Sequence, residues 1–341
     1  MELNSFNFAP FTYSQYSLSK KNIVALIVLF IHCLILFFVS DYQALLHILT
    51  SVLSVLFVSF ILSVLNKQKD WFSINLITEG TIIGFCVPTS YNPLVLFLLV
   101  GIAYFLIKGM FAGYGGNIIS VVAFTVAFLY FSFPAHFPEI ITNQMIKAQG
   151  NMLSTLHIKG LIKNDKAVTS MLNYFFSNLG IIIPEGYANL LASYTSTIPA
   201  FRYNIITLFF SALLLGFDFG ERIISFTFIF VYGVLVYVFG MSQIDGSFFN
   251  GDVIAAFCTT GIFFYAFFVV GENCTVPNTF ISKLVYGMIL GLLTFFLAGI
   301  GGSPIGIAFA IIISNLITPV FLRIEETLQN RFLRKKYGTI A

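Results

Sequence analysis

Charged side chains are scarce in this chain of 341 residues. Asp, Glu, Lys and Arg together make up 9% of the sequence, whereas a soluble domain carries roughly a quarter. Hydrophobic residues make up 58%. A water-soluble fold could not hide that much apolar surface, because too few polar residues remain to cover it. The composition therefore excludes an ordinary soluble protein and predicts a membrane protein.

Cysteine is also rare, and its four occurrences form no ligand pattern. Cys33, Cys86 and Cys258 fall in apolar segments and Cys274 in a short loop, without a C-x-x-C pair or a nearby histidine. We expect them to pack as small hydrophobic residues. The sequence also lacks a nucleotide-binding loop, a catalytic triad, a zinc spacing and a basic patch for nucleic acid. We therefore expect no metal site, no catalytic residue and no nucleic-acid partner.

What the chain does contain is a series of apolar segments of the kind that cross ~30 Å of hydrocarbon. The first follows Lys20 and Lys21 but has no small-residue cleavage site after it, so we interpret it as a retained helix and not as a signal peptide. Together the segments predict an all-α polytopic membrane protein of about ten transmembrane helices. They lie at residues 22–40, 43–65, 74–87, 94–107, 117–133, 203–217, 223–240, 253–271, 282–299 and 303–321.

The positions of the 17 basic residues predict the orientation of the chain. With a cytoplasmic N-terminus, twelve of them fall on the cytoplasmic side and five outside, four of these in one long polar loop. Short loops follow the positive-inside rule and long loops follow it poorly, so we predict that both termini are cytoplasmic. The predicted parts are a cytoplasmic N-terminal segment (1–21), five helices (22–133), an extracytoplasmic loop (134–202), five further helices (203–321) and a basic cytoplasmic tail (322–341).

Two patterns of glycine and proline recur at a nearly constant distance. Pro88 and Pro277 lie 189 residues apart, and Gly115 and Gly301, which each begin a Gly-Gly pair, lie 186 residues apart. Since five helices separate equivalent positions, the two groups would have opposite orientations, as in many transport proteins. The alternative is that these residues only mark loops. The short third and eighth segments, each interrupted near a proline, favour two inverted five-helix repeats with broken helices.

Acidic and amide side chains near the predicted breaks are candidates for an ion or solute path. An acidic group at membrane depth is costly unless it is paired or solvated, and it often marks such a path. Glu79 and Glu272 hold comparable places in the two groups, although each could instead lie at a helix end among lipid headgroups. Asn117 and Asn273 adjoin the same breaks, where amides can bind exposed backbone or a cation. We expect these four residues to line the path.

Two longer motifs resemble a known family. The run Lys108-Gly-Met-Phe-Ala-Gly-Tyr-Gly-Gly-Asn117 precedes a segment that ends in Phe131-Ser-Phe-Pro134, and Gly301-Gly-Ser-Pro-Ile-Gly-Ile-Ala-Phe-Ala precedes Asn315 and Pro319. Both resemble segments of the RnfD/NqrB family, and looser matches extend over nearly the whole chain. That family supplies a membrane subunit of the Rnf complex and of the Na+-translocating NADH:quinone reductase. The resemblance implies a bacterial inner-membrane protein that is non-catalytic alone and has other membrane and redox subunits as partners.

Members of this family typically carry FMN on the outer side, attached to a threonine in a motif like Ser-Gly-Ala-Thr. The corresponding run here is Asp165-Lys-Ala-Val-Thr-Ser-Met-Leu172, which places Met171 or Leu172 where the threonine belongs. Neither side chain can form a phosphoester, and the nearest hydroxyls are those of Thr169 and Ser170. The resemblance therefore implies an FMN region at this loop, while the departure from the motif argues against covalent attachment.

A second place for a phosphate or flavin contact precedes the sixth segment. Thr195 and Thr197 stand before Pro199 at a helix start, where free N–H groups can hold a phosphate. Helix capping explains the same residues without a ligand. Two functions follow from the sequence. The first is a subunit of an Rnf-type complex that couples redox reactions to the movement of Na+ or H+, and the alternative is a stand-alone permease for a small solute such as a flavin.

Overall fold

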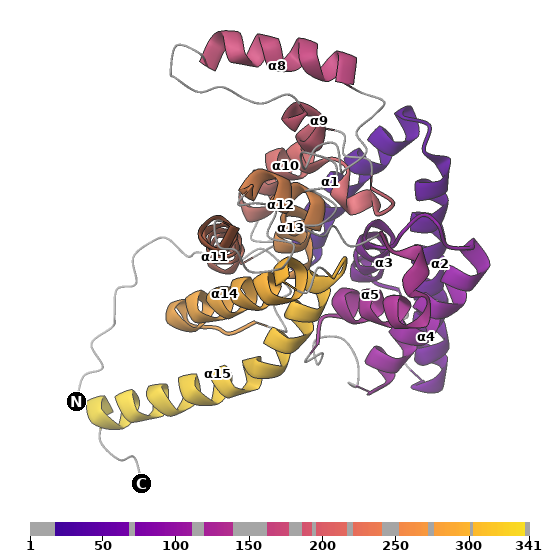
Figure 1. The fold of residues 1–341 in the computed structure, drawn as a ribbon. Coiled ribbons are helices and arrows are strands. Elements are labelled where there is room, and N and C mark those ends of the chain that lie inside the picture. Colours follow the sequence, from indigo (N-terminus) through magenta and orange to yellow (C-terminus); the bar gives the residue numbers. More distant parts are fainter. Residues whose placement is uncertain are drawn as a thin grey trace.

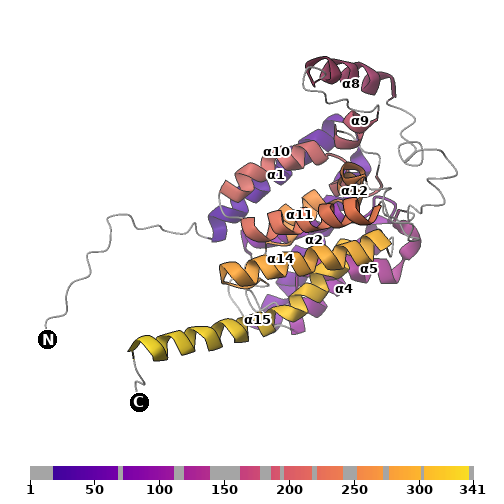
Figure 2. The same cartoon turned by 60° about the vertical axis from the view of Figure 1, so that its left-hand side comes forward.

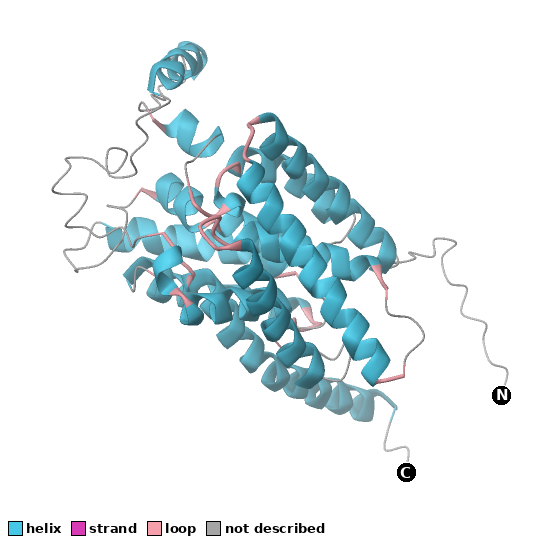
Figure 3. Ribbon diagram, turned by 90° about the vertical axis from the view of Figure 1, so that its right-hand side faces the viewer, coloured by secondary structure: helices cyan, strands magenta, loops and turns pink. Residues whose placement is uncertain are grey.

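In the computed structural model all regular elements of the described residues are helices (Figure 3). α1 (Leu18–Phe38) begins and α15 (Gly306–Tyr337) ends at the same end of the bundle, which we call the terminal end (Figure 2). The opposite end, where α8 (Ile162–Phe176) and α9 (Tyr187–Ala192) lie, is the loop end. The structure describes residues 18–67, 72–110, 119–138, 162–176, 186–192, 196–216, 221–240, 252–271, 276–300 and 303–337.

The first group of helices runs from α1 to α5 and occupies one side of the bundle, coloured indigo to magenta in Figure 1. Polar residues fix where two of these helices start: Asp41 accepts a hydrogen bond from the Ala44 N–H at 3.2 Å, and Ser120 accepts one from the Ala123 N–H at 3.5 Å. The bounds are α2 Tyr42–Leu65, α3 Ile74–Cys86, α4 Pro93–Met110 and α5 Val121–Ser132.

The second group is less regular. Gly261 separates α12 from α13 with a φ of +71°, a left-handed conformation that favours glycine. Two π-helical segments, η5 and η6, follow in the same group, and the sequence patterns predicted neither them nor the Gly261 kink. The bounds are α10 Asn204–Gly216, α11 Arg222–Gly240, α12 Val253–Thr260, α13 Ile262–Phe264, η5 Tyr265–Val269, α14 Phe280–Thr294 and η6 Phe295–Ile300.

The outer surface of the helices is strongly apolar. Large side chains such as Phe30, Phe209 and Phe230 are more than half exposed, which water would penalise and a bilayer accommodates. Five described helices are long and apolar enough to cross a membrane by themselves, and four shorter apolar helices accompany them. Each of the ten predicted segments coincides with a described helix or helix series. The chain is therefore an all-α polytopic membrane protein, as predicted.

Glycine allows two pairs of helices to approach closely. On α3, a Cβ added at Gly84 would lie 2.6 Å from the Cα of Ile48 in α2. On α14, a Cβ added at Gly291 would lie 2.9 Å from the Cβ of Val231 in α11. Each of these glycines has another glycine four residues before it, a spacing that brings helix backbones together inside membranes.

Between the two groups the described chain forms small elements at the loop end. These are two short 3₁₀ turns, η1 (Pro134–His136) and η3 (Pro199–Phe201), together with α8 and α9. Within the predicted extracytoplasmic loop, the spacing of apolar residues at 139–159 predicts an amphipathic helix, and these residues lie outside the described part of the chain. At the other end of the chain, α15 continues past residue 321, where we placed the start of the tail. It contains Pro319 and bends near its middle in Figure 1, as a proline inside a helix explains.

Candidate functional site

A buried charge cluster lies between α3 and α4, toward the terminal end. The Lys108 ammonium is 3.2 Å from Glu79 Oε1, and the Tyr104 hydroxyl donates to Glu79 Oε2 at 2.7 Å. The Lys108 Nζ also lies 5.6 Å from the centre of the Tyr104 ring. Only 6% of the Lys108 side chain and 19% of the Glu79 side chain are exposed. Glu79 is therefore a paired acidic group, and most of its side chain is covered by the bundle.

Helical spacing explains how one carboxylate obtains both partners. Tyr104 and Lys108 are four residues apart on α4, so they share a face, and that face meets Glu79. At 3.2 Å the attraction amounts to about 5 kcal/mol for an effective dielectric constant of about 20, before the cost of removing both charges from water. Lys108 falls just outside the segment predicted at 94–107, and its pairing with Glu79 was not predicted. An acidic residue in an apolar helix needs a partner, and a search for a basic residue near the same end of a neighbouring segment would have identified Lys108.

The centre of the molecule is aromatic. The ring of His32 in α1 lies edge-on to Phe85 of α3 and to Phe268 of η5, with centroids 5.9 and 6.3 Å away. His32 Nε2 is 3.2 Å from the Thr207 hydroxyl of α10, which ties the first helix of one group to the first helix of the other. Phe85 also packs against Phe264, at 5.7 Å between centroids. The interrupted helices of the two groups thus meet through buried rings around one histidine.

The break after α3 is held by polar contacts from several elements. The Tyr91 hydroxyl donates to the Leu129 carbonyl at 2.9 Å, and Ser90 donates to the carbonyl of His136 at 2.9 Å. His47 of α2 has Nε2 2.7 Å from the Tyr91 carbonyl. The interruption predicted near Pro88 is therefore confined to residues 87–92, since α3 is regular up to Cys86.

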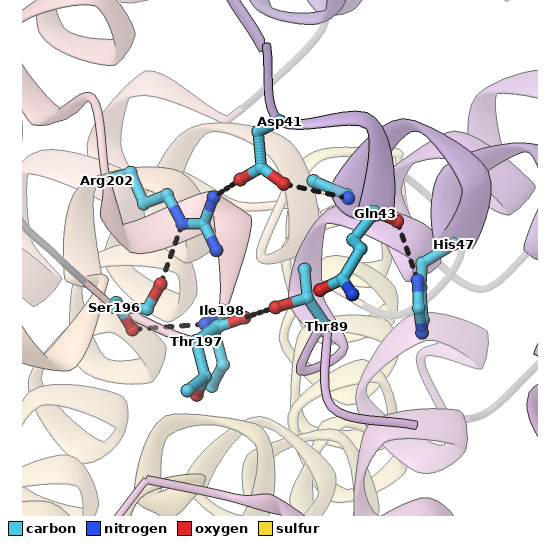
Figure 4. A network of polar contacts seen from close by, with 9 residues as sticks. Asp41, Gln43, His47, Thr89, Ser196, Thr197, Ile198 and Arg202 are labelled. Atoms are coloured by element: carbon cyan, nitrogen blue, oxygen red, sulfur yellow. Dashed lines mark hydrogen bonds and ion pairs between the residues drawn. The ribbon is translucent and has the colours of Figure 1, made fainter. Parts of the chain in front are cut away.

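The segment Ser196–Arg202, which we call the strap, lies against this break (Figure 4). The Thr197 carbonyl accepts from the Thr89 N–H at 2.9 Å and from the Thr89 hydroxyl at 3.2 Å. Arg202 pairs with Asp41, the residue that caps α2, and its Nε donates to the Ser196 carbonyl at 2.7 Å. Thr197, predicted as a phosphate contact, is thus joined to α3 through its backbone, and its side chain is exposed.

A second aspartate has an equivalent double role on the other group. Asp252 caps α12 by accepting from the Ala255 N–H at 3.0 Å, and it also accepts the Tyr187 hydroxyl of α9. Burial, together with the neighbouring Asp252 carboxylate, raises the pKa of Tyr187, so this hydroxyl remains a donor. Asp252 is thus a half-buried anchor for the loop end.

Two more acidic residues fasten the terminal end, and the sequence analysis singled out neither. Glu325 of α15 accepts hydrogen bonds from the N–H groups of Asn278 and Thr279 at 3.3 and 2.9 Å, just before α14 begins. Glu221 pairs with Lys283 of α14 at 2.7 Å. Carboxylates at a helix start satisfy its free N–H groups and favour its dipole. Glu325 therefore fixes the chain directly after Pro277, near which the second interruption was predicted.

The residues of the expected FMN region lie on α8. Met171 is 64% exposed, and Leu172, the alternative position, is half-buried. Thr169 is buried, and the exposed Ser170 donates its hydroxyl to the Ala167 carbonyl at 2.9 Å. The residues at the expected attachment point therefore do not fit a phosphoester to FMN. Among the described residues no cluster of metal-ligating side chains is present. The predicted site residues Asn117, Thr195, Glu272 and Asn273 lie outside the described part of the chain.

Comparison with known proteins gives a match over nearly the whole length. The model of the NQR2, RnfD, RnfE family matches residues 5–331. The D subunit of the ion-translocating oxidoreductase complex of Erwinia tasmaniensis is 38% identical over 55 residues, 16% of either chain. The D subunit of the proton-translocating ferredoxin:NAD(+) oxidoreductase complex of Clostridium ljungdahlii is 26% identical over 107 residues, which is 31% of this chain and 29% of that protein. The alignments thus cover less than a third of these relatives.

Proposed function

The chain belongs to the NQR2, RnfD, RnfE family, and on this premise we propose that it is the membrane subunit of an Rnf-type ion-translocating electron-transport complex. Neighbouring subunits supply most redox centres, and this chain supplies a scaffold that moves Na+ or H+ through the bacterial inner membrane with both termini in the cytoplasm. The relatives' names describe subunits of complexes, which favours this function over a stand-alone flavin permease.

The observation that carries the proposal is the buried Glu79–Lys108 pair. A carboxylate inside a membrane protein can hold a cation, but here Lys108 already neutralises it. A translocated ion that binds Glu79 takes the place of the Lys108 ammonium, and the ammonium returns when the ion leaves. The lysine thus keeps the empty site neutral, which avoids leaving a lone buried charge. A change of redox charge in a neighbouring subunit then shifts the balance between the two states.

Ion flux per electron in the reconstituted complex tests this role. In Glu79→Gln the side chain keeps its shape and its hydrogen bond with Tyr104 but loses the negative charge, so we expect ion flux per electron to fall. Glu326→Gln, which removes an exposed acidic group of α15, is the matched control and should transport normally. Unchanged flux in Glu79→Gln would remove Glu79 from the path.

Flavin attachment has a separate test. Because Met171 and Leu172 cannot form a phosphoester, we expect acid precipitation of the purified protein to leave no flavin absorbance in the pellet. Flavin that remains in the denatured pellet would contradict this expectation, and Thr169→Ala compared with Ser170→Ala would then identify the attachment residue.

A further inference from the structure

The strap contacts both interrupted helices of the molecule. On one side its Thr197 carbonyl accepts two hydrogen bonds from Thr89, in the break after α3. On the other side Phe201, which is 2% exposed, places its ring directly over Gly261, the kink between α12 and α13. A Cβ added at Gly261 would overlap that ring. A segment of seven residues therefore touches one irregular point in each group.

Local bonds keep the Phe201 ring in place. Asn204 donates its amide to the Phe201 carbonyl at 2.9 Å and to the Cys258 carbonyl of α12 at 3.2 Å. Arg202, the next residue in the chain, is held by Asp41 and by the Ser196 carbonyl (Figure 4). The backbone that carries the ring is therefore linked to α12 through Asn204 and to the start of α2 through Arg202.

The helix series under this ring is the one whose backbone departs most from regular geometry. Gly261 adopts a positive φ, and the π-helical η5 follows four residues later. Such departures often mark places where helices rearrange. The ring fills the space that a side chain at residue 261 would occupy, so the kink and the ring depend on each other. A shift of the strap changes the packing that holds the kink.

We propose that the strap is a coupling device, in which Phe201 is the positioning residue that holds the Gly261 kink, and Asp41 together with Thr89 holds the strap. Movement at the break after α3 is transmitted through the strap and loosens α12. The proposal rests on these contacts and not on the identity of the transported ion. The strap proposal can therefore be wrong while the Glu79 path is correct, and the reverse also holds.

Alkylation of Cys258 provides the measurement. This thiol is fully buried on α12, and a buried thiol reacts only when the structure around it opens. The protein is the full chain with Cys33, Cys86 and Cys274 replaced by alanine, treated with a maleimide. We expect Phe201→Ala to raise the labelling rate about tenfold or more, because local opening controls the reaction. Phe201→Leu refills part of the space and should give an intermediate rate.

Ile107→Ala is the control for general loosening. Ile107 is also buried, at 2% exposure, but it lies near the end of α4, fourteen residues after the start of that helix and so about 20 Å from the break. We expect Cys258 labelling in this variant to stay near the parent rate. Equal rates in Ile107→Ala and Phe201→Ala would overturn the proposal. If Phe201→Ala does not fold, the same comparison is made with Phe201→Leu.

Asp41→Asn tests the coupling itself. Asparagine still caps α2 but no longer pairs ionically with Arg202. Although Asp41 belongs to the other group of helices, we expect its replacement to raise Cys258 labelling several-fold. Adding Asp41→Asn to the Phe201 variant should add little, since both act through the same segment. Parent-like labelling in Asp41→Asn, or independent effects of the two changes, would show that the strap does not couple the groups.

Discussion

The two groups of helices differ most at their interrupted helices. In the first group α3 is regular from Ile74 to Cys86 and packs on α2 through closely fitted glycines. In the second group the corresponding stretch is divided into α12, α13 and η5, with a left-handed Gly261 between the first two. Both π-helical segments of the described chain also lie in the second group. The first group thus consists of regular helices, and the irregular helical segments lie in the second group.

The burial of the ion pairs also differs between the groups. In the first group 6% of the Lys108 side chain and 19% of the Glu79 side chain are exposed, whereas in the second group the values are 18% for Lys283 and 25% for Glu221. If the repeat holds at 189 and 186 residues, Phe268 and Thr294 take the places of Glu79 and Lys108, and both are buried and uncharged. Glu272, which we compared with Glu79, lies four residues after Phe268 and outside the described residues. An ion pair needs fixed geometry to offset its desolvation, which the regular helices α3 and α4 provide. This comparison predicts different responses to matched substitutions in the two groups.

The largest effect is expected from Lys108→Met. The substitution keeps most of the side-chain volume but leaves the Glu79 carboxylate buried without its cation. Breaking one side of a buried pair typically costs about 3 to 5 kcal/mol, and we expect a loss of that size in the free energy of unfolding in detergent. The midpoint of unfolding by SDS would measure it.

The double variant Glu79→Gln/Lys108→Met is the control for this prediction. With neither charge present, no uncompensated ion remains, so most of the lost stability should return. A double variant that is no more stable than Lys108→Met would mean that packing, and not charge, caused the loss. The first group would then have no special dependence on its ion pair.

Glycine substitutions compare the packing of the two groups. Gly84→Ala places a Cβ 2.6 Å from a backbone atom of α2, which cannot move independently, so we expect destabilisation of about 1 to 3 kcal/mol. Gly291→Ala meets the Val231 side chain at 2.9 Å and should cost less. Gly216→Ala is the control, because no atom lies within 4 Å of the added Cβ. Thermal unfolding of the three variants would rank them, and equal losses for Gly84→Ala and Gly216→Ala would contradict the tight packing of α3 on α2.

A smaller difference in stability is expected between variants of the two aspartates that anchor the loop end, Asp41 and Asp252. Asparagine caps a helix about as well as aspartate, so Asp41→Asn and Asp252→Asn both retain their caps. Asp41→Asn also loses the ion pair with Arg202, and a hydrogen bond to a charged group contributes about 1.5 to 3 kcal/mol. Asp252→Asn keeps an acceptor for the Tyr187 hydroxyl. We expect Asp41→Asn to be the less stable variant in the same unfolding assay, and the reverse order would refute the assignment of the strap's anchor.

Much of the fold was predictable from the sequence, because bilayer thickness fixes the length of apolar segments. All ten predicted segments coincide with helices or helix series, and the short third segment ends where Pro88 requires it. The family was predictable from the Gly-rich motifs. Charge pairing was less accessible: the sequence left Glu79 either on a path or at a helix end among headgroups, and it did not identify Lys108 as its partner. The two residues come together because α3 and α4 both pack on α2.

The irregular backbone segments could not be predicted from sequence patterns. A glycine with positive φ inside an apolar helix resembles any other glycine, so Gly261 gave no signal until the Phe201 ring was found over it. The π-helical segments depend in the same way on how neighbouring helices pack. The roles of Asp41 and Arg202 also depend on contacts between residues that are 161 apart in the chain. The exposure of Met171 on α8 depends likewise on how that helix lies at the loop end, which the sequence does not specify.

The smallest effect is expected at Thr294, the counterpart of Lys108. Its hydroxyl is buried and has no hydrogen-bond partner among the described residues. Thr294→Val exchanges this hydroxyl for a methyl group of similar shape, which removes an unsatisfied polar atom, so we expect stability to be unchanged or slightly higher. A loss as large as that of Lys108→Met would mean that Thr294 holds a polar partner, such as a water molecule or an ion, in the folded protein. The second group would then contain a buried polar site of its own at the position that Lys108 occupies in the first.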